Sequence, residues 1–149
     1  YNGGLNTASV DGTVTLNGTI VSSDDAIVLG AVTLASATTV DTNSTTTNRA
    51  DITLAAVTGG SNTLTLTTEN NITGADVTAS GNISGVTTLT LASVGGTATL
   101  SADVDVTTFT VGNTVANVAF TGNGSSVANS FTPDNDGTFI FGASGGTQT

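Results

Sequence analysis

The stretch Thr88-Leu89-Thr90-Leu91 alternates polar β-branched residues with leucines, which is typical of a strand with one buried face. Similar four-residue runs recur along the chain: Thr13–Leu16, Ala31–Leu34, Asp51–Leu54, Thr63–Leu66 and Thr97–Leu100. Turn-forming pairs such as Asn17-Gly18 and Gly95-Gly96 lie between these runs. No window keeps apolar residues at helical spacing for three helical turns. The sequence therefore predicts an all-β fold of short strands joined by tight turns.

The runs recur at a nearly constant interval. One apolar residue can be followed from run to run in steps of 18 to 20 positions: Leu16, Leu34, Leu54, Ile72, Leu91, Phe109 and Val127. A repeat of this length is too short for a hairpin-based propeller blade, but it fits one turn of a β-solenoid. We therefore predict a single-stranded β-solenoid (β-helix) of about seven coils, with residues 1–149 forming one domain.

The apolar content suits stacked coils. Leu, Ile, Val and Phe make up 37 of the 149 residues, whereas 33 are Thr, 14 are Ser, 14 are Asn and 19 are Gly. A narrow solenoid core needs only aliphatic residues stacked from coil to coil. A β-sandwich is the alternative fold at this length, but it favours longer strands and aromatic core residues. The first hundred residues contain only one aromatic residue, Tyr1.

Composition also excludes several functions. Cys and His are absent, so thiolate or imidazole metal sites, Cys or His nucleophiles and disulfides are excluded. Arg49 is the only basic residue against ten Asp and Glu69, giving a formal charge of -10, which argues against nucleic-acid binding. The longest apolar runs have four to five residues, so we expect no transmembrane segment. A strongly acidic, soluble surface favours an extracellular or cell-surface setting.

The C-terminal part differs from the rest of the chain. All five Phe and the only Pro, Pro133, lie within residues 109–149. We expect this region to act as a cap or an assembly segment, or its larger side chains to fill wider final coils. Solenoid ends expose unpaired backbone edges, which must be capped or joined to another chain. The predicted assembly interface consists of residues near the two ends: Leu5, Val10, Phe139, Ile140 and Phe141.

Candidate catalytic and metal sites are few. Asp103 and Asp105 flank Val104 and would point the same way on a strand, as paired catalytic carboxylates do. Without His or Lys beside them, a solvent-facing strand is the better interpretation, so we predict no enzyme and no catalytic residues. Asp134, Asn135 and Asp136 precede Gly137 and resemble half of a calcium loop, although a Pro133 turn explains the same residues. We therefore expect no resident cofactor, with calcium as the alternative.

Thr-x-Thr motifs recur in the chain, and regular threonine arrays on a flat solenoid face can bind ice. The motifs are Thr13/Thr15, Thr63/Thr65, Thr88/Thr90, Thr97/Thr99 and Thr108/Thr110. Their intervals of 50, 25, 9 and 11 residues predict that they do not share one face. β-branched residues that simply fill strands are the preferred interpretation.

The segments Asn71–Ala75 and Ser80–Ser84, together with the Thr-Leu-Thr-Leu runs, resemble the repeats of filamentous-haemagglutinin-type and autotransporter-passenger adhesins of bacteria. The resemblance covers roughly residues 10–130. It implies a secreted or surface-displayed right-handed β-helix that acts as a stalk, adhesin or matrix fibre, and it carries over no catalytic residues.

The expected function is therefore that of an extracellular structural or adhesive solenoid. It would pair end to end with further copies of itself or with neighbouring repeats of a larger adhesin. A module that binds host or matrix glycans is the alternative function, with ice as a further ligand.

Overall fold

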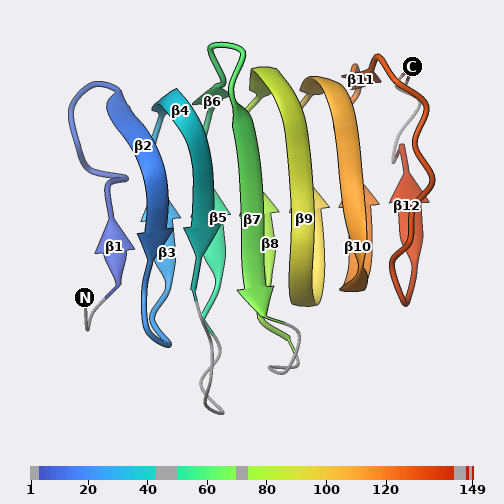
Figure 1. Ribbon diagram of the computed structural model, residues 1–149, viewed down its shortest axis with the longest axis horizontal. Coiled ribbons are helices and arrows are strands. Elements are labelled where there is room, and N and C mark those ends of the chain that lie inside the picture. The colour runs from blue at the N-terminus through green and yellow to red at the C-terminus, as the bar shows by residue number, and fades with distance from the viewer. Residues whose placement is uncertain (1–3, 43–49, 70–73, 143–146, 148) are drawn as a thin grey trace.

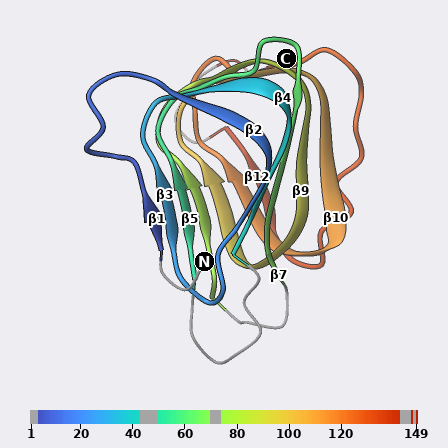
Figure 2. The same ribbon diagram turned by 60° about the vertical axis from the view of Figure 1, so that its left-hand side comes forward.

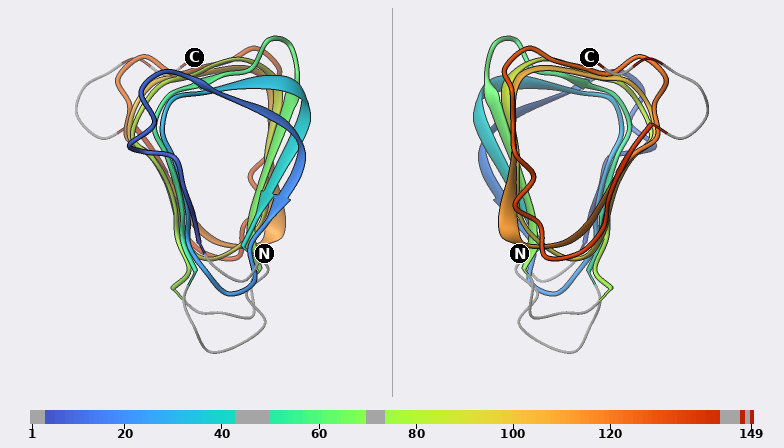
Figure 3. Two further views of the ribbon diagram at one scale, coloured as in Figure 1. Left: turned by 90° about the vertical axis from the view of Figure 1, so that its left-hand side faces the viewer. Right: turned by 90° about the vertical axis from the view of Figure 1, so that its right-hand side faces the viewer.

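The structure is a computed structural model that describes residues 4–42, 50–69, 74–142, 147 and 149. Its described part is a β-solenoid of about six turns without helices, right-handed and roughly triangular in outline (Figures 1 and 3). Twelve strands form one sheet in which every pair is parallel. The predicted all-β solenoid is thus confirmed. The β-sandwich alternative is wrong, because sandwich sheets are built from antiparallel pairs.

Three faces wind around the core. In Figure 1 we call them the back, top and front faces, and Figure 2 shows how the strands pass from one to the next. The strands are β1 (Leu5–Asn6), β2 (Val14–Val21), β3 (Ile27–Leu29), β4 (Val32–Asp41), β5 (Ile52–Leu54), β6 (Val57–Thr58), β7 (Thr63–Glu69), β8 (Val77–Ala79), β9 (Ile83–Leu100), β10 (Val104–Phe120), β11 (Ser126–Val127) and β12 (Phe139–Phe141).

The longer strands bend around corners and serve more than one face. The back face holds β1, β3, β5, β8, the ends of β9 and β10, and β12. The top face holds the beginnings of β2, β4, β9 and β10, together with β6 and β11. The front face holds the ends of β2 and β4, all of β7, and the middle of β9 and β10. Register shifts mark the bends within β9 and β10.

The repeat is longer and less regular than the sequence predicts. Partners on the back face follow one another at intervals of 20 to 25 residues: Leu5, Ile27, Ile52, Val77, Ala98, Val118 and Phe139. The two intervals of 25 residues contain the segments 43–49 and 70–73. The expected period of 18 to 20 residues and the count of seven coils therefore need correction to about six longer turns.

The residue track used to predict that period crosses between faces. Leu16 does pair with Leu34 on the top face, as expected. Leu54, however, pairs with Leu29 on the back face, and Phe109 pairs with Leu89 on the front face. Ile72 lies outside the described residues. The track misleads because all three faces point aliphatic side chains inward, so a constant sequence interval does not identify one face.

The core is a stack of aliphatic side chains that runs along the solenoid. On the front face, the inward row is Ile20, Val40, Leu66, Leu91 and Val111. Leu66 and Leu91 are fully buried, and their strand neighbours alternate between inward apolar and outward polar residues. Each such leucine contributes about 2 kcal/mol by leaving water. Stacking like side chains from turn to turn therefore stabilises the fold without a large globular interior.

Side-chain oxygens at the corners link each turn to the next. Asp51 Oδ1 accepts a hydrogen bond from the Asp76 backbone N–H at 2.8 Å, and Asp76 Oδ1 accepts one from the Thr97 N–H at 2.8 Å. Asn117 Oδ1 accepts one from the Thr138 N–H at 3.0 Å. Charged acceptors strengthen such bonds. Several acidic residues thus serve to satisfy the backbone where strands begin.

The five phenylalanines form one connected cluster in the last turns. Phe109 and Phe120 lie in the core with ring centroids 4.9 Å apart, edge to face. Phe131 packs on Phe109 at 5.3 Å, and Phe139 connects Phe131 to Phe141 at 5.9 and 6.1 Å. Both interpretations of residues 109–149 therefore apply in part: the first two rings fill the core, and the last three cover its C-terminal end.

Candidate functional site

The front face carries a continuous outward row of threonines, one from each turn. The register places Thr19 beside Thr39, Thr39 beside Thr65, Thr65 beside Thr90 and Thr90 beside Thr110. Each of them precedes a residue of the inward row, so the alternation of a strand directs the threonines outward. The strands that carry them lie side by side in Figure 1.

A second row runs parallel to the first. Thr63, Thr88 and Thr108 are paired in register two residues before the first row on β7, β9 and β10. Three adjacent turns therefore present two threonines each. With strands about 4.8 Å apart and about 6.6 Å between alternate residues of a strand, the six hydroxyls form a two-dimensional grid. We call these eight residues the threonine face: Thr19, Thr39, Thr63, Thr65, Thr88, Thr90, Thr108 and Thr110.

The expectation that the Thr-x-Thr motifs lie on different faces is wrong for three of the five. Thr63/Thr65, Thr88/Thr90 and Thr108/Thr110 share the front face. Thr15 lies on the top face and Thr99 on the back face, as irregular spacing would suggest. Extra residues in one turn are taken up between strands, so unequal sequence intervals still give equal spacing on the face. Thr19 and Thr39 belong to no such motif, and only their position before Ile20 and Val40 points to them.

The first row is chemically uniform. Among the described residues, none of its five hydroxyls forms a hydrogen bond with another described group, whereas Thr108 Oγ1 accepts one from Asn129 Nδ2 at 2.9 Å. The face itself contains no charged residue. The nearest acidic positions along these strands, Asp41 and Glu69, come at the ends of β4 and β7. The threonine face thus offers methyl and hydroxyl groups to an external ligand.

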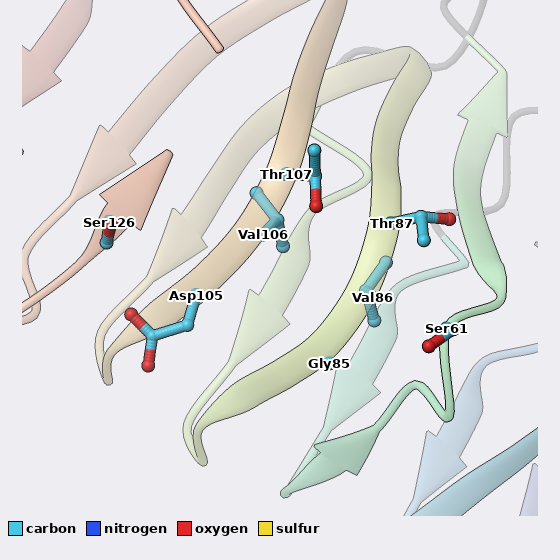
Figure 4. A pocket seen from close by; sticks show the side chains of 8 residues that line it. All are labelled: Ser61, Gly85, Val86, Thr87, Asp105, Val106, Thr107 and Ser126. Atoms are coloured by element: carbon cyan, nitrogen blue, oxygen red, sulfur yellow. The ribbon is translucent and has the colours of Figure 1, made fainter. Parts of the chain in front are cut away.

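A shallow groove crosses the corner between the top and front faces (Figure 4). It spans four turns and is lined by Ser61, Gly85, Val86, Thr87, Asp105, Val106, Thr107 and Ser126. Gly85 has a φ of 65° and no counterpart in the neighbouring strand, because Ser84 pairs with Asp105 and Val86 with Val106. This bulge, which deforms the strand, lies in the groove. The sequence gives no signal for the groove, since its polar residues come from four separate segments.

The two carboxylates considered for catalysis have different surroundings. Asp103 lies at the corner before β10, where its Oδ1 accepts a hydrogen bond from the Gly124 N–H at 2.8 Å. Asp105 is exposed in the groove beside Ser126 (Figure 4). Asp103 therefore has a role in linking turns, and Asp105 is the carboxylate that a ligand in the groove would meet.

The calcium candidate lies in the segment between β11 and β12. Asp134 and Asp136 are exposed, Asn135 is half-buried, and the Asp136 N–H donates to the Val115 carbonyl at 3.0 Å. The described residues include no group of three or more His, Cys, Asp or Glu side chains placed to share a metal ion. That search does not consider Asn135, so calcium binding here stays a prediction.

The five residues of the predicted assembly interface lie at the two ends of the stack. Leu5 in β1 lines a hollow at the N-terminal end together with Thr19, Ile20, Val21, Ser22 and Ile27. Val10 is 52% exposed in the loop that follows β1. Phe139, Ile140 and Phe141 form β12 at the opposite end, where Ile140 is 48% and Phe141 45% exposed. Each end therefore exposes apolar side chains, and Figure 1 shows the two ends far apart.

Comparison of the chain with protein-family models, curated proteins and solved structures found no match. The resemblance to adhesin repeats therefore remains an expectation drawn from the sequence. No helix in the described ranges is long and apolar enough to span a membrane.

Proposed function

We propose that this chain is a structural and adhesive segment of a bacterial surface fibre, adhesin or matrix filament that works outside the cell. The observation that carries this proposal is the unbroken parallel stack from β1 to β12, in which each turn pairs with the next. Such a stack is a rod with a dry core and polar rows along its faces. Its many hydroxyl, amide and carboxylate groups offer repeated weak contacts to a surface.

The ends support a fibre as well. β12 pairs only with β10, so its other edge has no partner strand among the described residues, and Ile140 and Phe141 lie beside that edge. At the opposite end, the hollow beside Leu5 and Ile20 leaves part of the core uncovered. A further turn, from a second copy or from neighbouring repeats of a larger adhesin, would extend the sheet and cover both apolar surfaces. A head-to-tail contact of this kind generates filaments rather than closed dimers.

Self-association should depend on Ile140. We expect the purified chain to form filaments as its concentration rises, visible by electron microscopy and by an increase of mass in sedimentation. Ile140→Asp should raise the concentration needed for filaments on the order of tenfold, because it places a charge in the apolar contact. Thr107→Asp, which adds the same charge on the side of the rod, should leave assembly unchanged. A chain that stays a single short rod at every concentration would contradict self-assembly and leave neighbouring repeats of a larger adhesin as the partner.

Glycan binding is the second candidate function, and the groove around Asp105 favours it. Serine and threonine hydroxyls from four turns surround one carboxylate there, a donor and acceptor set that suits sugar hydroxyls. We expect a glycan array to show binding that Asp105→Ala weakens on the order of tenfold, since a hydrogen bond to a charged group is worth about 1.5–3 kcal/mol. Asp11→Ala removes the same charge from an exposed loop and serves as the control. Equal binding by both variants would place the glycans elsewhere.

A further inference from the structure

The threonine face has the properties of a surface that orders water. Each threonine side chain has few rotamers in a strand, so its hydroxyl and methyl group are held in a defined direction. Parallel pairing fixes the register of Thr65, Thr90 and Thr110, and of the second row beside them. The grid is therefore built into the backbone and needs no rearrangement to meet a ligand.

The dimensions of this grid select the ligand. One repeat is the distance between strands, about 4.8 Å, and the other is the distance between alternate residues, about 6.6 Å. These two repeats are close to the spacings of water oxygens on exposed planes of hexagonal ice. A hydroxyl can replace one lattice water in its hydrogen bonds, while the adjacent methyl group leaves the neighbouring waters bonded to each other.

The electrostatics of the face agree with such a ligand. The chain has a formal charge of -10, yet the eight threonines include no charged neighbour within their two rows. A charged group would hold its own hydration shell and disturb a regular water layer. The five hydroxyls of the longer row make no hydrogen bond to other described groups, which leaves them available to water.

We propose that the threonine face binds ice, with the six residues on β7, β9 and β10 as its centre and Thr39 and Thr19 as its extension. This binding is separate from the assembly of the rod, because it uses a side face and not the ends. An extracellular rod with this face would attach to ice crystals or slow their growth. The chemistry recognised is a lattice of water, and no solute is needed.

Partition into ice tests the proposal. The purified chain is frozen slowly into a growing polycrystalline ice hemisphere, and the enclosed protein is compared with an inert protein of similar size. We expect the chain to be enriched in ice and the double variant T65Y/T90Y to lose that enrichment on the order of tenfold, a change equivalent to about 1.4 kcal/mol. The outward tyrosines should break the flat grid while leaving the buried leucines beside them in place. Circular dichroism and urea unfolding should show that the variant is folded.

A matched control separates the face from the rest of the surface. Thr58→Tyr places the same ring at an exposed position of the top face and should retain full enrichment. Exclusion of the unaltered chain from ice, or equal loss with Thr58→Tyr, would overturn the proposal. Binding to cellulose or chitin particles that T65Y/T90Y abolishes, with no enrichment in ice, would also overturn it and assign the face to a crystalline polysaccharide.

Discussion

A Gly59→Ala variant should be less stable than the unaltered chain by about 3 kcal/mol, the upper part of the range for forcing extra atoms into a packed site. A Cβ at Gly59 would lie 2.5 Å from the carbonyl oxygen of Gly85 and 2.5 Å from the backbone N of Val86. Both atoms belong to the next turn, and the Gly59 N–H also donates to the Ser84 carbonyl at 2.8 Å. The added methyl group can therefore be accommodated only by separating two paired turns. Urea unfolding followed by circular dichroism measures the loss.

Gly18→Ala is the matched control for this prediction. A Cβ at Gly18 meets no atom within 4 Å, but the residue has a φ of 77°. Its substitution should cost about 1 kcal/mol from backbone strain alone. Equal losses for the two variants would contradict the interpretation that close approach between turns requires glycine at position 59.

The second large effect is expected in the middle of the core. Leu91 is fully buried between Leu66 and Val111 of the adjacent turns. Leu91→Ala should lower the free energy of unfolding by about 2–5 kcal/mol, because it removes buried surface and leaves a cavity that the stacked turns on both sides prevent from closing. Chemical denaturation provides the measurement.

The control for Leu91 is an outward residue on a strand of the same length of stack. Thr99→Ala removes a side chain that is half-exposed on the back face, so we expect a loss below about 1 kcal/mol. A loss below 1 kcal/mol for Leu91→Ala as well would indicate that the turns relax around the cavity. That outcome would contradict a tightly packed core.

The sequence predicts the fold class well because local alternation and turn residues are enough to define it. Thr63–Leu66 and Thr88–Leu91 are strands in the structure, with threonines outside and leucines inside. The period was wrong because nothing in the composition distinguishes an inward leucine of one face from that of another. Leu34 and Leu54 are equivalent in sequence context, yet they belong to different faces.

The candidate sites show the same limit. The end residues Leu5 and Phe139–Phe141 could be named in advance because their positions in the chain place them in the first and last turns. The threonine face could not, since its rows depend on which residues share a turn. Thr65 and Thr90 are 25 residues apart and Thr90 and Thr110 only 20, yet each pair is adjacent in space. Such distances become equal only when the extra residues between strands are assigned to a turn.

The unequal length of the turns has a consequence for how this chain can change. Segments 43–49 and 70–73 add residues to two turns, while the strands on either side keep their register with the neighbouring turns. Length and surface pattern are thus independent variables in this architecture. Insertions between the front and back faces can accumulate during evolution, or be introduced by design to display a foreign peptide, while the spacing of the hydroxyl grid is preserved.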